Sequence, residues 1–313
     1  MVSLEELAGG QPDLSQAVLL FEAGRHRVYW VGSEEATHFR CNAYLLCHGD
    51  ANVLIDPGGR FHYDQVSRRV EGVVDPQKIT HIVVQHQDPD LCGSLPLWLE
   101  RQGGIKVLTN SRAAVLLPHY GLTCPIEETD DGWLPLGDGA KLRFLPAPFM
   151  HFPGAFVTYD PISKFLFSGD IFAAVNADWQ MFVQDFDLHS GFMEIFHTDY
   201  MAGHRALAGF TAMLRREQVP IRAILPQHGS IIMERDVPKA LEWLGNLLCG
   251  LDLIYPADEP RSTPSQRRSP PAVPVADRAL GKRPMNTAAL VLGLLLILTV
   301  GAAVEGWIPT LAR

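Results

Sequence analysis

The chain has 313 residues, a formal net charge of −9 and 47% hydrophobic residues. This hydrophobic fraction is that of a chain with a buried core, and the length suits one α/β domain with an appendage. The negative charge argues against nucleic acid as the main partner. The cysteines are odd in number and lack CxxC spacing, so we expect buried or free thiols in a reducing compartment. They are Cys41, Cys47, Cys92, Cys124 and Cys249.

Strand-like and helix-like runs follow one another along residues 1–254, which we expect to form one domain. The pattern predicts strands at 17–21, 27–31, 43–47 and 52–56, a helix at 63–71, then a helix at 95–101, a strand at 106–109 and a helix at 111–119. Further strands are predicted at 141–146, 155–159 and 164–168. Leu207, Phe210, Met213 and Leu214 recur at helical spacing. Strands before helices in two similar halves fit a layered sandwich.

A His-x-Asp-x-Asp triplet, formed by His86, Asp88 and Asp90, follows the apolar run 79–85. A strand that ends on such a triplet delivers imidazole and carboxylate ligands to a loop. Asp and Asn also cap turns after strands, so the triplet alone is equally well explained as a capped turn.

Three more candidate ligands stand alone downstream, each after a strand-like run: His151, Asp170 and His228. Asp170 taken alone is better explained as a turn residue or a helix cap. The six candidate ligands taken together favour a metal site over separate turns and caps, because strand ends in α/β proteins meet at common clefts. Three imidazoles and three carboxylates exceed the need of one tetrahedral zinc and predict two metal ions that share a carboxylate.

This order and spacing resemble the metallo-β-lactamase superfamily, and within it the flavodiiron and oxygen-binding diiron branch. In that branch a carboxylate replaces the second histidine of the triplet, and Asp88 takes that place here. The segments 54–59, 166–172 and 225–229 are similar to the branch as well. The resemblance covers residues from about 16 to about 250 and implies an α/β fold, the four-layer αββα sandwich.

The resemblance implies a first metal bound by His86, Asp88 and His151 and a second bound by Asp90 and His228. Asp170 would bridge the two ions. The chain departs from the family at two positions. Asp88 is one methylene shorter than the usual Glu, and Leu91 stands where the second metal usually gains a histidine, so that metal has an open position, a water or low occupancy.

The donor set bears on the identity of the metals. Replacing an imidazole by a carboxylate makes the site harder and favours iron or manganese over zinc. We therefore expect two iron ions, with zinc or manganese as the alternatives.

Other polar residues near the motifs allow two explanations each. His197, Tyr200 and His204 have helical spacing and could order the ligands or donate a proton, and of these we name Tyr200 and His197 as catalytic candidates. Asp56 either hydrogen-bonds a metal-binding histidine or forms a turn. His81 is expected to be a core or pairing residue. Histidines without a local pattern are expected on the surface: His26, His38, His48, His62, His119 and His189.

The C-terminal part has a different composition. Residues 255–285 are rich in proline and predict a disordered tether. Residues 286–306 include an uncharged apolar stretch long enough to span a bilayer as one helix, followed by a short tail at 307–313. Arg278, Lys282 and Arg283 precede the stretch, so the positive-inside rule places the large domain in the cytoplasm, at the inner membrane. No signal peptide is visible at the N-terminus.

These features lead to one functional hypothesis and two alternatives. The resemblance implies a membrane-tethered diiron protein that binds, senses or reduces dioxygen or nitric oxide. No flavodoxin-like or rubredoxin-like region is recognisable, so turnover would need an external electron donor, and a homodimer is a further expectation. The first alternative is a dinuclear hydrolase of a thioester, lactone or phosphoester. The second is a metal-poor scaffold at the membrane.

Overall fold

The computed structural model of the protein describes residues 4–10, 12–33, 40–122, 124–129, 132–175 and 179–256. All of them lie in the first of two units into which the chain divides, Met1–Glu259 and Pro260–Arg313. The predicted tether, apart from residues 255 and 256, the predicted span and the tail lie outside the described residues. Within the described ranges, no helix combines the length and the apolar character needed to cross a bilayer.

Seven of the described strands form a first mixed sheet in the order β1-β2-β3-β4-β5-β6-β7. β1 to β4 pair antiparallel, and β4 to β7 pair in parallel. The strands are β1 (Val18–Ala23), β2 (His26–Trp30), β3 (Tyr44–His48), β4 (Ala51–Ile55), β5 (His81–Val83), β6 (Lys106–Thr109) and β7 (Ile126–Glu128).

Six other described strands form a second sheet in the order β13-β12-β11-β10-β9-β8. β11 and β12 run parallel, and the other neighbours are antiparallel. The strands are β8 (Trp133–Gly137), β9 (Ala140–Pro146), β10 (Phe156–Asp160), β11 (Phe165–Gly169), β12 (Ala223–Pro226) and β13 (Ile232–Met233).

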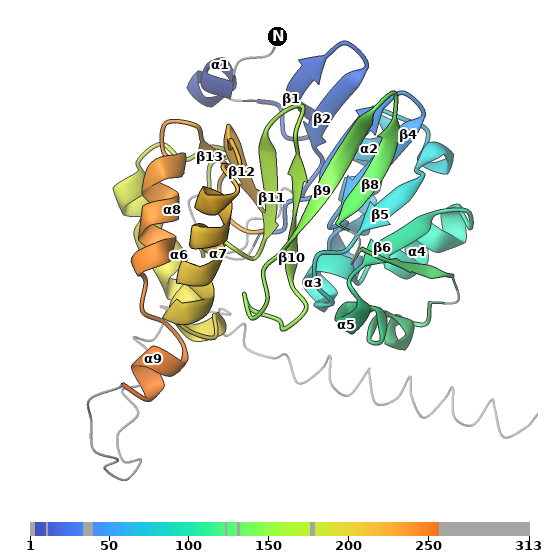
Figure 1. Ribbon diagram of the computed structural model, residues 1–313. Helices are drawn as coiled ribbons and strands as arrows, with labels where there is room; N and C mark the ends of the chain where they lie inside the picture. The colour runs from blue at the N-terminus through green and yellow to red at the C-terminus, as the bar shows by residue number, and fades with distance from the viewer. Residues whose placement is uncertain are drawn as a thin grey trace, which may run out of the picture. The chain divides into compact units, whose positions relative to one another are not determined.

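Helices cover the two sheets on separate sides, and Figure 1 shows α6, α7 and α8 gathered beside β11 to β13. The α-helices are α1 (Leu4–Gly9), α2 (Tyr63–Glu71), α3 (Pro89–Cys92), α4 (Leu95–Arg101), α5 (Ser111–Ala114), α6 (Phe186–Tyr200), α7 (His204–Arg216), α8 (Val237–Asn246) and α9 (Leu251–Ile254). Short 3₁₀ turns lie at Arg60–His62, Pro76–Lys78 and Leu117–Tyr120.

Alternation along the strands creates the layers, since successive side chains point to opposite faces of a sheet. In β3, Tyr44 and Leu46 join the core between the sheets, where the Tyr44 and Phe167 rings lie 5.3 Å apart. Leu45 of the same strand packs outward with Trp98 of α4. The second sheet likewise packs outward against α6, α7 and α8. These three cores define an α/β sandwich with two mixed sheets.

At two prolines the structure differs from the sequence prediction. The predicted helix at 111–119 is wrong, because α5 ends at Ala114 and a 3₁₀ turn carries Pro118, which lacks the N–H that a continuing helix needs. β8, which the sequence pattern does not predict, contains Pro135 and lies at an edge of the second sheet. A proline is tolerated there because an edge strand leaves some N–H groups unpaired.

The prediction of surface positions is wrong for four of the pattern-free histidines: His26, His48, His62 and His189 are buried. His26 Nε2 lies 2.8 Å from Asp160 Oδ2 and its Nδ1 lies 3.1 Å from His48 Nδ1. Asp160 belongs to the second sheet and His26 to the first, so this polar network connects the sheets. Only tertiary structure could supply these partners. His119 is exposed, and His38 lies outside the described residues.

The buried His189 should make the stability of the protein pH-dependent. Burial lowers the pKa of His189 to about 4, and its Nε2 has no hydrogen-bond partner. In the unfolded chain this imidazole is protonated below its ordinary pKa of about 6.5, whereas the folded state keeps it neutral. Acidification therefore favours the unfolded state through the window between these two values.

We expect the unfolding free energy of the wild type to fall by about 2 kcal/mol relative to His189→Leu between pH 7 and pH 5. Urea unfolding of both proteins at the two pH values measures this difference. His119→Leu, at an exposed histidine in the 3₁₀ turn Leu117–Tyr120, is the control and should show no such change. A pH-independent difference between wild type and His189→Leu would contradict a neutral buried imidazole.

Candidate metal centre

The six predicted ligands all follow strand ends and meet at one edge of the sandwich. His86 follows β5, Asp170 follows β11 directly, and His228 follows β12. His151 lies in the connection between β9 and β10. β5 belongs to the parallel part of the first sheet, and β11 and β12 run parallel in the second. The carboxyl ends of such strands share an edge, which is where open sheets build their sites.

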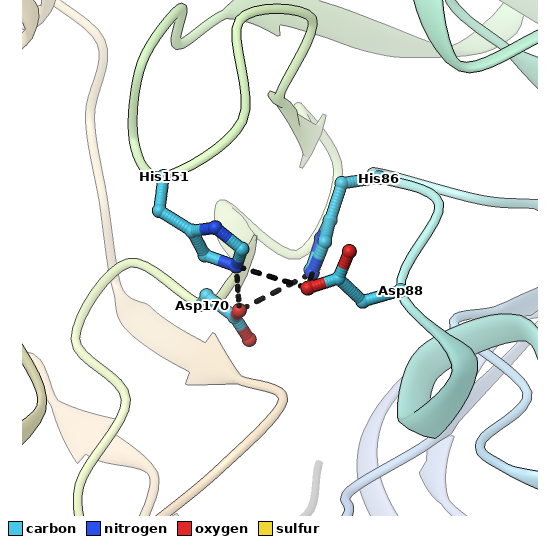
Figure 2. Close-up of side chains that lie close together, drawn as sticks. All are labelled: His86, Asp88, His151 and Asp170. Carbon is cyan, nitrogen blue, oxygen red and sulfur yellow. Dashed lines mark hydrogen bonds and ion pairs between the residues drawn. The ribbon is translucent and has the colours of Figure 1, made fainter. Parts of the chain in front are cut away.

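The first group consists of His86, Asp88, His151 and Asp170, which surround a common point (Figure 2). His151 Nε2 lies 2.9 Å from Asp170 Oδ2 and 3.3 Å from Asp88 Oδ2. His86 Nε2 lies 3.2 Å from Asp170 Oδ2 and 3.9 Å from Asp88 Oδ2. Asp88 occupies the N-cap position of α3 without capping it. Its carboxylate instead faces the two imidazoles, so the capped-turn explanation fails for this residue.

The second group contains Asp90 and His228, whose Oδ2 and Nε2 atoms lie 3.0 Å apart. Asp170 faces this group with its other oxygen, because Oδ1 lies 3.5 Å from His228 Nε2. One carboxylate thus presents Oδ2 to the first group and Oδ1 to the second. This is the arrangement that a carboxylate bridging two metal ions requires.

The residues fit a pair of metal ions. Ligand atoms that bind one ion at about 2.1 Å lie about 3.0 to 3.4 Å from one another, which is close to three of the four separations given above for the first group. His86 Nε2 and Asp170 Oδ1 are buried and have no hydrogen-bond partner. Buried polar atoms normally have partners, and a cation between these groups would satisfy both.

The electrostatics of the ligands in the metal-free protein follow from their contacts. Burial opposes ionisation of Asp170, but His86 and His151 hold the pKa of its carboxyl well below the usual range. Burial likewise opposes the charged form of His151, whereas Asp170 and Asp88 raise its pKa to about 10. Protons on the imidazoles therefore take the place of metal ions, and metal binding must displace them.

Backbone contacts fix the orientation of His228. Its Nδ1 lies 3.0 Å from the Arg40 carbonyl oxygen, which can only accept, so Nδ1 carries the proton and Nε2 is left to bind a metal. Cys41 Sγ lies 3.9 Å from the same Nδ1, and Cys41, Asp90 and His228 form a second potential ligand group. No sequence pattern marks Cys41 as a ligand, because only an isolated β-bridge between residues 41 and 228 brings it to the site.

Asp56 supports the site through Gln85 rather than through a metal-binding histidine. Its carboxylate accepts hydrogen bonds from the Gln85 backbone N–H (3.0 Å) and from Gln85 Nε2 (2.6 Å). Gln85 Oε1 in turn accepts from the Thr158 N–H of the second sheet at 2.6 Å. The residue that precedes His86 is thus held to both sheets. Burial raises the pKa of Asp56 to about 7.

The loop that carries Asp88 is held from its other side. Tyr120 Oη donates to the Gln87 carbonyl oxygen at 2.7 Å, and Cys92 Sγ lies 3.2 Å from the Asp88 carbonyl oxygen. Leu91 is fully buried and packs in the outer core of the first sheet. It offers no ligand atom to the second group, as the sequence already implied.

The three candidate supporting residues lie in different surroundings. His197 is buried, its Nδ1 lies 2.8 Å from the Met193 carbonyl oxygen, and its Nε2 accepts from the Phe172 N–H at 3.0 Å. It therefore holds the loop after Asp170 and makes no hydrogen bond to a ligand. Burial lowers its pKa to about 4, so it stays neutral. Tyr200 is largely exposed, with its ring 5.9 Å from that of His151.

His204 makes its hydrogen bonds outside the ligand set. Its N–H donates to Asp252 Oδ2, and its Nδ1 lies 3.2 Å from the Leu247 carbonyl oxygen. These contacts join the start of α7 to the region around α9. Phe196 of α6, by contrast, has its ring near those of His151 and His228. No sequence pattern distinguishes this phenylalanine from an ordinary core residue.

Two mixed sheets between helices, with imidazoles and carboxylates at the strand ends, define a metallo-β-lactamase-like protein of the diiron branch. A family model described as "ODP family beta lactamase" matches residues 39–229, and the chain belongs to this family.

Solved structures of the chemotaxis sensor ODP are similar to the chain over nearly their whole length. A peroxy diiron species of that sensor is 34% identical with a TM-score of 0.67, and the match covers 76% of this chain and 98% of the sensor chain. The apo state of the sensor from T. denticola gives the same identity and TM-score. The rubredoxin oxygen:oxidoreductase of Desulfovibrio gigas, at 22% identity and a TM-score of 0.65, shares the fold; the match covers 74% of this chain and 61% of that chain.

Curated relatives include a flavo-diiron protein, FprA2, of Clostridium acetobutylicum, 33% identical over 45% of this chain and 36% of that protein. An anaerobic nitric oxide reductase flavorubredoxin of Aliivibrio fischeri is 24% identical over 71% of this chain and 49% of that protein. The chain thus spans about a third to a half of the length of these relatives.

Proposed function

We propose that the protein binds and senses a small diatomic molecule, dioxygen or nitric oxide, at two iron ions held by the six ligands. The observation that carries this proposal is the position of Asp170, whose two oxygens face two separate groups of ligands. A single metal would not require both oxygens of one buried carboxylate to face imidazoles.

Iron ions bound here would supply reversible electron exchange with dioxygen or nitric oxide, which the side chains alone cannot perform. The three carboxylates make the donor set hard, which favours iron over zinc. The chain's own residues hold the geometry: Gln85 orients the His86 loop, His197 fixes the loop after Asp170, and the Arg40 carbonyl fixes the tautomer of His228. Each of these contacts uses a neutral amide, imidazole or carbonyl group that needs no change of charge.

Two kinds of relatives support this proposal, a sensor and several reductases. The match to the chemotaxis sensor ODP extends over 98% of that chain and includes a structure of a peroxy diiron species. Names among the other relatives refer to oxygen and nitric oxide reduction. We infer that binding or sensing is the activity of this chain and that reduction would require electrons from a separate donor. The external electron donor and the homodimer remain predictions.

We further propose that the domain is tethered to the inner membrane with its metal centre in the cytoplasm. The support is in the sequence: residues 286–306 contain a long apolar stretch, and Arg278, Lys282 and Arg283 stand before it. A sensor tethered in this way would sample dissolved gas close to the bilayer.

Anaerobic purification followed by metal analysis tests the proposal. We expect close to two irons per chain and a change in the visible absorption spectrum when air is admitted. Asp90→Asn, which weakens only the second group, is the matched control and should lose the spectral change while keeping iron in the first group. Two zinc ions together with hydrolysis of a thioester or lactone would instead identify a hydrolase, and little bound metal would identify a scaffold.

A further inference from the structure

The exposure of the ligands defines an open and a closed side of the centre. The side chains of Asp88 and Asp90 are 32% and 34% exposed, whereas those of His86, Asp170 and His228 are almost fully buried. Solvent therefore reaches the centre from the side of the triplet loop. The side chains that pack around the ligand histidines therefore influence which molecules bind at the centre.

Phe196 makes contact with the ligand imidazoles of both groups. Its ring centroid lies 6.3 Å from that of His151, nearly perpendicular at 74°, and 6.5 Å from that of His228. The phenylalanine is only 2% exposed. One apolar ring thus lies beside a ligand of the first metal position and a ligand of the second.

Tyr200, one helical turn further along α6, lies on the outer side of Phe196. The two rings are stacked at 4.6 Å with an interplanar angle of 9°. Tyr200 is 58% exposed, and its ring lies 5.9 Å from that of His151. Tyr200 is therefore the solvent-exposed ring of the stack and Phe196 the buried one, and the His151 ring lies near both.

The helix that carries this stack is anchored to the metal loop. The Asp185 side chain caps the start of α6 by accepting from two backbone N–H groups, and His197 accepts the Phe172 N–H at 3.0 Å. Asp170 precedes Phe172 by two residues. The Phe196 ring is consequently held at a fixed place relative to the ligands.

We infer that Phe196 and Tyr200 form an aromatic wall that makes the centre selective for small uncharged ligands over anions. This inference rests on the proposed function. Aromatic faces carry partial negative charge and, apart from the Tyr hydroxyl, these rings offer no hydrogen-bond donor. An anion that enters beside them loses water without gaining a donor, which is costly, whereas a neutral diatomic loses little. Phe196 is in this sense a specificity-determining residue.

The test compares a neutral and an anionic probe on the anaerobic two-iron protein. Nitric oxide and azide are titrated spectroscopically into the wild type, Phe196→Ala and the control Phe186→Ala, which truncates another buried phenylalanine of the same helix and core. We expect Phe196→Ala to bind azide about tenfold more tightly, with a change of less than about threefold for nitric oxide. Phe186→Ala should leave the ratio of the two affinities unchanged.

The outcomes separate the two proposals. A wild type that holds two irons but binds neither probe overturns the proposed function, whereas an unchanged azide to nitric oxide ratio in folded, metal-loaded Phe196→Ala overturns only the aromatic wall. If Phe196→Ala loses metal or fold, Tyr200→Ala decides, since Tyr200 lies at the surface and its loss must still favour azide. Tyr200→Phe keeps the stack and should behave as the wild type; a change there would assign the effect to the hydroxyl and overturn the wall.

Discussion

Replacing Asp170 by asparagine should remove both metal ions, whereas replacing Asp90 by asparagine should remove only one. Asp170 is the one ligand whose two oxygens face both groups, at 2.9 Å from His151 Nε2 and 3.5 Å from His228 Nε2. Asparagine keeps the size of the side chain, but it removes a negative charge shared by two cations and turns one oxygen into an NH₂ group that cannot bind a metal.

Mutating a residue that only hydrogen-bonds to a metal ligand typically weakens metal binding by about 10- to 100-fold. Loss of a ligand that both ions share should weaken the binding of both ions by more than this. Iron content per chain after dialysis, with circular dichroism to verify the fold, measures the effect. Asp138→Asn, at an exposed carboxylate paired with Arg25, is the control and should retain both ions. Retention of one full equivalent in Asp170→Asn would show that Asp170 serves a single metal.

Truncation after Pro256 should convert the protein from a membrane-bound form into a soluble one without loss of metal. All six ligands precede residue 229, and an apolar helix of about 18 residues holds a protein far more strongly than surface charges do. The full-length protein should sediment with membranes and resist alkaline carbonate. The truncated protein should stay in the supernatant with the same iron content.

A matched control keeps the full length of the chain. Leu294→Arg combined with Leu296→Arg places two charges at the centre of the apolar stretch, each at a cost of about 2.5 to 3.5 kcal/mol for insertion, and should release the protein. In intact cells, protease added from outside should leave the metal domain uncut. Extraction of the wild type by salt alone would reduce the tail to a peripheral contact, and external cleavage of the domain would reverse the proposed orientation.

The sequence predicted much of the sandwich because its strands are regular. The predicted strands at 43–47 and 52–56 correspond to β3 (Tyr44–His48) and β4 (Ala51–Ile55), and the helix at 63–71 coincides with α2. Strong apolar runs bounded by turn residues determine such elements locally. The predicted helix at 111–119 is wrong because Pro118, a local signal against a continuing helix, lies in a 3₁₀ turn.

The chemical types of the ligands and their positions after strands could be predicted from the chain alone, because they depend on residues that are close in sequence. Long-range packing directs the oxygens of Asp170 toward two groups, places Cys41 beside His228, and brings the Phe196 ring near the rings of both His151 and His228. The same packing brings His26 of the first sheet into contact with Asp160 of the second. Each of these facts is a contact between distant segments, and no local period or motif in the chain encodes the relative placement of two sheets and a helix.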